Sequence, residues 1–183
     1  IENTYGSVLS GNMIEECEGA AIILDRDCYG ITISANVLAD DFGGGIDLRD
    51  AWGCTISANT FTIDPVRSIT VRAASGRITI TGNNFSDSYI GDQTKREGKP
   101  NLATGILLEG TTDIVISGNL FSGLANQAVE ADEKCRRILI TGNIVTGVNA
   151  SAEAAGKPAV EIRATEGVEM GANLLDTGAA RQK

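Results

Sequence analysis

The chain has 183 residues, 42% of them hydrophobic, which suits one folded domain with a buried core and argues against a disordered segment. Its formal net charge of −9 argues against nucleic acid as a partner, because binding phosphates requires clustered Lys and Arg. No apolar run approaches the ~18 residues that a membrane-spanning helix needs. The sequence has no histidine, so carboxylates, Arg, Lys and Tyr would have to carry any chemistry. We therefore expect a single domain over residues 1–183 with no nucleic acid partner and no membrane span.

The first residues already lie inside a repeated pattern. Ile1 aligns with Leu24 and Leu48, which stand in the middle of predicted strands. We therefore expect the repeat to be incomplete at the N-terminus and the chain to be a fragment of a longer protein.

A short motif recurs along the whole chain. In each copy, alternating apolar residues lead to a Gly or Ala and then to an Asn, and another apolar residue follows two positions later. The asparagines of the copies are Asn12, Asn36, Asn59, Asn83, Asn119, Asn143 and Asn173. Most steps between neighbouring asparagines are 23 or 24 residues long, by subtraction of their positions. A period near two dozen residues is typical of a solenoid, in which each repeat forms one coil that stacks on the next.

Each coil is predicted to begin with a strand in which every second residue is apolar. The examples are 21–25, 45–49, 68–72, 105–109, 128–132 and 159–163. The alternation sends the apolar residues inward, and a turn then leads to a second strand that ends at the Asn corner.

Two further apolar columns are predicted inside the coils. One lies on the second strand and runs from Ile33 to Met170, and the other follows the asparagines and ends at Leu175. The column after the asparagines contains three phenylalanines, which we expect to stack on one another. They are Phe61, Phe85 and Phe121. We also expect the asparagine amides to form a ladder, because equivalent residues of stacked coils lie ~4.8 Å apart and can donate to one neighbour while accepting from the other.

The four cysteines are predicted to be free thiols. Cys54 takes an inward position that Ile31 and Ile78 occupy in the neighbouring coils, so it replaces a core aliphatic residue. Cys28 and Cys135 share a turn column but lie several coils apart, which excludes a bond between them.

Coil length varies only in the connection that returns to the first strand. This connection is long at 86–104 and at 146–158. The longer of the two carries Lys95, Arg96 and Lys99, a basic spot on an acidic protein. Such an insertion can wall a binding face, or it can be a tolerated loop in solvent, and the sequence leaves both alternatives open.

The repeated tails, such as TISANTF, ITITGNNF and VISGNLF, fit the pattern I-x-I-[ST]-[GA]-N-x-F. This pattern resembles the right-handed parallel β-helix of the pectate-lyase-like superfamily, including its NosD-type members, over essentially the whole chain. The resemblance implies an all-β, right-handed parallel β-helix solenoid of about seven coils. It also implies that a polysaccharide would lie along the first-strand face. The superfamily contains lyases, hydrolases, epimerases and phage tailspikes, and the sequence has no motif that is specific to lyases or hydrolases.

Charged side chains form two columns on the outward face of the first strand. One column places opposite charges on neighbouring coils, which predicts surface salt bridges worth roughly 0–1 kcal/mol each. The predicted pairs are Asp25–Arg49, Arg72–Glu109 and Asp132–Arg163. The other column places Glu130 beside Glu161, a like-charge pair that is unfavourable unless it is solvated or bound to a cation.

Three aromatic residues occupy one position in the turn after the first strand, in consecutive coils. They are Tyr5, Tyr29 and Trp52. Aromatic faces can stack on the apolar faces of sugar rings, so this row predicts a substrate-binding track for a glycan. The alternative is a ladder that only packs the turn.

The charged residues near this row suggest two kinds of chemistry. The resemblance implies that a lyase would hold Ca²⁺ on acidic side chains and use an Arg as the base. Our candidate Ca²⁺ ligands are Asp40, Asp41 and Asp47. Arg49 above Arg72 is a repulsive pair, and an anionic sugar bound there would relieve the repulsion. Alternatively, Asp25 and Asp47 could be the two carboxyls of an inverting hydrolase. The candidate catalytic residues are Asp25, Asp47, Arg49 and Arg72.

The sequence favours a secreted, periplasmic or cell-surface protein that binds an acidic polysaccharide and cleaves or epimerises it by β-elimination-type chemistry. A glycoside hydrolase on the same fold is one alternative. A non-enzymatic tailspike, adhesin or surface scaffold is another. Regular coils favour the scaffold, whereas the aromatic row and the uneven loops favour the enzyme.

Overall fold

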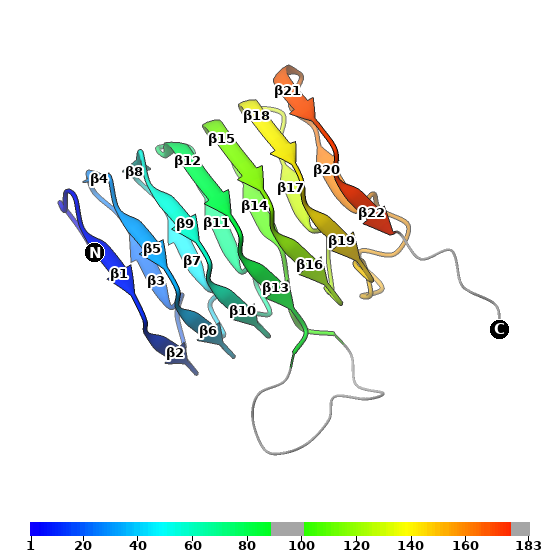
Figure 1. The fold of residues 1–183 in the computed structure, drawn as a ribbon, viewed down its shortest axis with the longest axis horizontal. Helices are drawn as coiled ribbons and strands as arrows, with labels where there is room; N and C mark the ends of the chain where they lie inside the picture. The colour runs from blue at the N-terminus through cyan, green and yellow to red at the C-terminus, as the bar shows by residue number, and fades with distance from the viewer. Residues whose placement is uncertain (89–100, 177–183) are drawn as a thin grey trace.

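In the computed structural model, which describes residues 1–88 and 101–176, the chain winds through stacked coils of short β-strands. The strands form three parallel sheets that run the length of the stack (Figure 1). Each strand pairs with the equivalent strand of the next coil, for example Ile46 with Ile69 and Phe61 with Phe85. No described residue is helical. The predicted all-β, parallel β-helix is therefore confirmed.

The three sheets follow the order of the strands within a coil, and we name them accordingly. The first sheet contains β3 (Ile22–Leu24), β7 (Ile46–Leu48), β11 (Ile69–Val71), β14 (Ile106–Leu108), β17 (Val129–Ala131) and β20 (Val160–Ile162). The second sheet contains β1 (Val8–Ser10), β4 (Cys28–Tyr29), β5 (Thr32–Ser34), β8 (Ala51–Trp52), β9 (Thr55–Ser57), β12 (Gly76–Thr81), β15 (Thr112–Ser117), β18 (Arg136–Thr141) and β21 (Glu166–Met170). The third sheet contains β2 (Met13–Glu15), β6 (Val37–Ala39), β10 (Thr60–Thr62), β13 (Asn84–Ser86), β16 (Leu120–Ser122), β19 (Ile144–Thr146) and β22 (Leu174–Asp176).

The inward columns of the three sheets meet in one apolar core. The three phenylalanines stack as predicted: the ring centroids of Phe61 and Phe85 are 4.7 Å apart with an interplanar angle of 3°, and those of Phe85 and Phe121 are 4.7 Å apart at 9°. All three side chains are at most 1% exposed. Burying a large apolar side chain stabilises the fold by about 1.5–3 kcal/mol, so repeating one such column in every coil stabilises the whole stack.

The asparagine ladder is confirmed in all seven copies of the motif. Each Asn from Asn12 to Asn143 donates its side-chain amide and its backbone N–H to the Oδ1 of the next Asn, over 2.9–3.0 Å. The amide also donates to a backbone carbonyl, as from Asn83 to the Ile56 oxygen at 3.0 Å. In the six copies from Asn12 to Asn143, the residue before the Asn has a positive φ, which is 55° at Ala58, so a left-handed corner accounts for the small residue there.

The cysteine prediction is also confirmed. All four thiols are free, and Cys54 lies in the core between Ile31 and Ile78, with 1% of its surface exposed. Cys28 and Cys135 are buried in the turns of coils that lie far apart in the stack.

Some sequence predictions hold in part or fall outside the described residues. Met170 and Leu175 continue the inward columns in register with the buried Ile140 and Val145, but they are 47% and 44% exposed, because no described coil stacks on the coil that holds them. The predicted basic spot at Lys95, Arg96 and Lys99 lies outside the described residues. No helix capable of crossing a lipid bilayer occurs in the described ranges.

Candidate functional site

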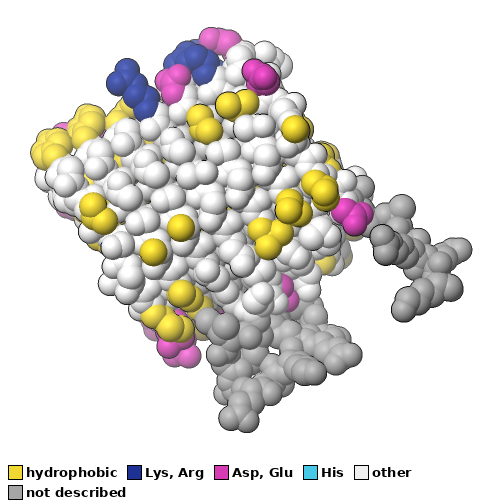
Figure 2. All heavy atoms as spheres, in the orientation of Figure 1, with side chains coloured by type: hydrophobic (Ala, Val, Ile, Leu, Met, Phe, Trp, Pro, Cys, Tyr) yellow, Lys and Arg dark blue, Asp and Glu magenta, His cyan; other side chains and the backbone are white. Residues whose placement is uncertain are grey.

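Charged side chains are sparse on the broad face that the second and third sheets present in Figure 2. Basic and acidic side chains lie along its upper edge, where the second-sheet strands begin, and a run of hydrophobic side chains lies at the N-terminal end of the same edge. The candidate sites are therefore this edge and the outward face of the first sheet.

Asp47, on β7, lies between two arginines on the outward face of the first sheet. Its Oδ2 accepts a hydrogen bond from Arg49 Nε and its Oδ1 accepts one from Arg72 Nε, both at 2.8 Å. Asp47 points outward and yet is only 6% exposed, with the two guanidinium groups beside it. Asp47 therefore already offsets the expected repulsion between Arg49 and Arg72, without an anionic ligand.

Arg72 is the most heavily engaged of these side chains. Besides Asp47, it contacts Glu109 through Nη1 at 2.8 Å, which confirms that predicted salt bridge. The predicted pair of Arg49 and Asp25 is also present, at the longer distance of 4.0 Å between Nη1 and Oδ2. The hydrogen bond to Asp47 is the main reason that the pKa of Arg72 is raised. A general base has to give up its proton near neutral pH, so this environment works against Arg72 in that role.

The two glutamates expected to repel each other have separate partners. Glu130 Oε2 is 2.6 Å from Arg67 Nη2, and both side chains are largely buried. Glu161 Oε2 accepts a hydrogen bond from Gln127 Nε2 at 2.7 Å. Neither carboxylate therefore needs a cation to offset the other.

The predicted pair of Asp132 and Arg163 does not form. Asp132 Oδ1 instead accepts hydrogen bonds from the backbone N–H groups of Gly110 and Cys135, at 2.9 and 3.1 Å, because it closes the turn after the first sheet. Arg163 faces Glu133, with 3.9 Å between Nε and Oε2.

The three predicted Ca²⁺ ligands do not fit a metal ion as a group. Asp41 is fully buried, its Oδ1 accepts the backbone N–H of Cys17 at 3.1 Å, and burial raises its pKa. Asp47 is held by two arginines on the first sheet, as described above. In the described ranges, no three His, Cys, Asp or Glu side chains, with or without Asp40, are grouped to hold a metal.

Tyr5, Tyr29 and Trp52 form a row at the start of the second sheet, which we call the aromatic shelf. Tyr29 pairs with Trp52 between β4 and β8, and a parallel bridge joins Tyr5 to Tyr29. The rings of Tyr5 and Tyr29 are stacked, with centroids 5.6 Å apart and an interplanar angle of 11°. The two tyrosines are 65% and 42% exposed, so the shelf faces solvent instead of the core.

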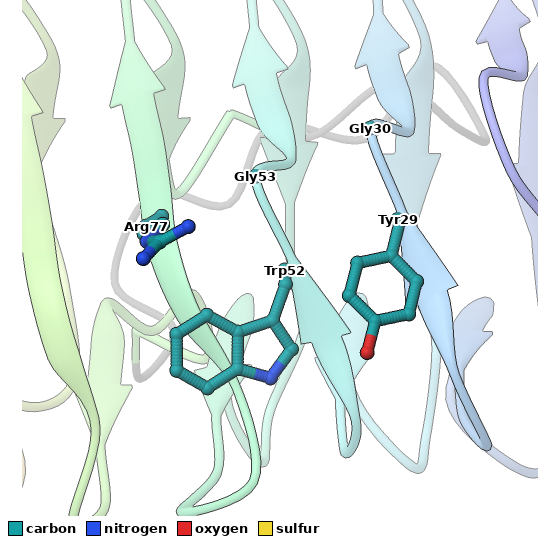
Figure 3. A pocket seen from close by; sticks show the side chains of 5 residues that line it. All are labelled: Tyr29, Gly30, Trp52, Gly53 and Arg77. Carbon is teal, nitrogen blue, oxygen red and sulfur yellow. The ribbon is translucent and has the colours of Figure 1, made fainter.

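A shallow hollow of ≈ 460 Å³ opens beside the shelf (Figure 3). It is lined by Tyr29, Gly30, Trp52, Gly53 and Arg77. Trp52 leans over the following coil, where a Cβ on Gly76 would lie 2.8 Å from the indole Cζ3. The absence of a side chain at Gly76 thus leaves room for the indole, which lies between Arg77 and Tyr29 in Figure 3.

Residues 1–166 match the model of a known protein family, which is described as the right handed beta helix region. The chain belongs to this family. Comparison with curated proteins and with solved structures gives no match. The family match and the three parallel sheets together confirm the right-handed parallel β-helix, and they describe a fold that hosts many activities.

In this right-handed β-helix, sequence reasoning missed one residue of the hollow. The Arg77 guanidinium carbon lies 5.8 Å from the centroid of the Trp52 ring, within the range of a cation–π contact. The signal was present in the sequence: the residue after each shelf aromatic is Gly6, Gly30 or Gly53, and the next coil replaces this glycine with Arg77. When the repeats are aligned on the asparagines, the aromatic column stands out, whereas the next column, which is glycine in three coils and Arg77 in the fourth, does not.

Proposed function

We propose that this β-helix protein binds a polysaccharide, with sugar rings stacked on the aromatic shelf. The carrying observation is the pair of stacked, solvent-exposed rings of Tyr5 and Tyr29 beside the hollow at Trp52. An aromatic ring offers an apolar face, and Tyr and Trp add a polar group at one end, which suits a sugar with its apolar face and its hydroxyl rim. Coils stack in a straight line, so the shelf presents its rings in a row along which an extended chain can lie.

The first-sheet residues support binding more than catalysis. A β-elimination would require Arg49 or Arg72 to act as a base, but both donate to Asp47 and the pKa of Arg72 is raised. An inverting hydrolase would require Asp47 to reach a water molecule, and its two oxygens are occupied by the same arginines. Cleavage and epimerisation therefore have less support than the binding of a glycan by an adhesin, a tailspike or the binding region of an enzyme.

A protein with this function would act where polysaccharides are found. A secreted, periplasmic or cell-surface location is therefore part of the proposal. Ca²⁺ is not part of it, because Asp40, Asp41 and Asp47 do not form a group of ligands.

Affinity electrophoresis against a panel of neutral and acidic soluble polysaccharides tests the proposal. Tyr29→Ala and Trp52→Ala should each weaken binding about three- to tenfold, the range expected for losing one aromatic stacking partner. Phe42→Ala is the matched control, since Phe42 is an aromatic residue that is 59% exposed but lies in a different turn of the coil. Binding that is unchanged in both shelf variants, or a wild-type chain that binds nothing in the panel, would show that the proposal is wrong.

A further inference from the structure

We infer that the hollow beside the aromatic shelf is an anion subsite, in which Arg77 binds a carboxylate or sulfate group carried by a sugar stacked near Trp52. This inference rests on the proposed function, and it moves charge recognition from the first-sheet arginines to an arginine that sequence reasoning did not single out. Two observations support it, the place of Arg77 and its lack of a carboxylate partner, and a third, its backbone conformation, shows how the turn presents the side chain.

The first observation is the place of Arg77 in the hollow. Its guanidinium carbon lies 5.8 Å from the Trp52 centroid, and Figure 3 shows the side chain at the end of the hollow opposite Tyr29. A sugar stacked on Trp52 in the hollow would therefore have an arginine beside it. The planar guanidinium group carries N–H donors in a geometry that matches carboxylate and sulfate oxygens.

The second observation is the balance of charge around Arg77. The nearest position in the next coil is Asp113, and Arg137 already binds it in a bidentate manner, with Nε–Oδ1 at 2.6 Å and Nη2–Oδ2 at 3.0 Å. Arg137 is also the main reason that the pKa of Asp113 is lowered, with Arg77 a smaller contributor. Within the described part of the chain, Arg77 makes no ion pair or hydrogen bond of its own, so its donors remain available to a ligand.

The contrast with the first sheet makes this assignment specific. Arg49 and Arg72 each donate to Asp47, and Arg72 also contacts Glu109. A ligand anion there would have to compete with carboxylates that are already in place. On a protein with a formal net charge of −9, an exposed arginine without a carboxylate partner is the better anion site.

The third observation is the backbone of Arg77. Its φ of 54° lies in the left-handed region, which costs energy for a residue with a Cβ. In the two preceding coils the equivalent positions are Gly30 and Gly53, both with a φ of 63°, so the fold accepts glycine at this position without strain. The same left-handed conformation recurs at Asp113 and Arg137 in the next two coils, with φ of 61° and 52°, so it belongs to this turn of every coil, and at Arg77 it places an arginine where the shelf ends.

The two glycines explain why the hollow is open. A Cβ built on Gly53 would meet no atom within 4 Å, and one on Gly30 would meet only a backbone nitrogen of Gly6 at 3.9 Å. The space beside the Tyr29 and Trp52 rings is therefore free of protein atoms and is accessible to a sugar. Arg77, in contrast, fills its own position with a charged side chain, so the hollow is closed at one end by a cation.

The test compares polysaccharides that share a backbone and differ in charge. The probes are hydroxyethyl, carboxymethyl and sulfated cellulose, together with polygalacturonate and its methyl ester. Arg77→Asn removes the charge and keeps a residue that tolerates a positive φ, and Arg77→Lys keeps the charge. Arg136→Asn is the control, because it removes an arginine whose side chain is 55% exposed and faces Glu166 at 3.8 Å, on the same sheet but three coils away from Trp52.

We expect Arg77→Asn to weaken binding of the charged probes about three- to tenfold and to leave binding of the neutral probes unchanged. Arg77→Lys should restore part of the loss, Arg136→Asn should have no effect, and added salt should weaken only the charged probes. Equal wild-type affinity for charged and neutral probes, with Arg77→Asn altering neither, would overturn the inference and leave the proposed function standing. Absence of binding to any probe would overturn both. A larger loss with carboxymethyl than with sulfated cellulose would assign the subsite to carboxylates, and the reverse to sulfates.

Discussion

Asp64 occupies the position of Asp41 one coil further along the stack, and both side chains are fully buried (0% exposed). Burial, together with the negative charge of Asp41, raises the pKa of Asp64 to about 8. Neither carboxyl oxygen of Asp64 has a hydrogen-bond partner in the described part of the chain. The folded protein therefore holds Asp64 mainly in its neutral, protonated form at pH 7.

This pair predicts that stability falls as the pH rises. The folded state keeps the Asp64 proton up to about pH 8, whereas the unfolded chain releases it near the ordinary pKa of 3.8. The contribution of this proton to the free energy of unfolding is therefore complete below about pH 4 and is lost as the pH rises towards 8. The slope for one such group is at most about 1.4 kcal/mol per pH unit. Urea unfolding between pH 4 and 9 should show this decline, and Asp64→Asn should flatten it and stabilise the chain at pH 8.

Asp113 is the control for this experiment because its contribution has the opposite sign. Its pKa is lowered, mainly by the hydrogen bond from Arg137, so its stabilising effect is present above its ordinary pKa and is lost as the pH falls. Asp113→Asn should therefore leave the decline towards pH 8 in place. A wild-type slope that persists unchanged in Asp64→Asn would refute the assignment to Asp64.

The asparagine ladder predicts a loss of stability that depends on the place of the coil. Asn83 is 2% exposed and exchanges hydrogen bonds with Asn59 and Asn119, so Asn83→Ala leaves buried groups on both sides without partners. We expect a loss of about 1–3 kcal/mol in urea unfolding. Asn12→Ala should cost less, because Asn12 is exposed and has a described Asn on one side only. Equal losses in the two variants would contradict the ladder as a source of stability.

The sequence was sufficient for the fold because the repeat aligns side chains of the same kind in every coil. Asn59 stacks on Asn83 and Phe61 on Phe85, and these columns follow directly from the spacing of the motif. Stacked coils convert a one-dimensional period into three-dimensional contacts, so neighbours in space are known once the period is known.

The candidate site was harder to predict because long side chains reach across columns. Alternation places Asp47 outward but does not show that Arg49 and Arg72 both turn towards it. Arg67 reaches Glu130 two coils away, a contact that no column alignment contains. Asp132 was read as an ion-pair partner, although it has shorter-range partners in the backbone of its own turn. Rotamer choice, which the period does not determine, decides these contacts.

The bridge that Asp47 makes between two arginines predicts an asymmetry between two carboxylates on the first sheet. Asp47→Asn removes the charge that Arg49 and Arg72 share, and we expect a loss of about 1–2 kcal/mol, reduced by the partial exposure of both arginines. Asp25→Asn should cost less, since Asp25 lies 4.0 Å from Arg49. Thermal melts at low and high salt would measure both, and a larger loss for Asp25→Asn would contradict the bridge.

Gly76 controls the position of the Trp52 ring, and this can be observed directly because Trp52 is the only tryptophan in the chain. In Gly76→Ala, the new Cβ would lie 2.8 Å from the indole Cζ3 and 2.9 Å from the Thr112 carbonyl oxygen, so the ring has to move. A ring pushed into solvent should emit at longer wavelength, and glycan binding should weaken together with this shift. Gly19→Ala is the control, because a Cβ there meets nothing within 4 Å. If Gly76→Ala leaves both the emission spectrum and the affinity of the wild type unchanged, the indole does not depend on Gly76 for its place beside the hollow.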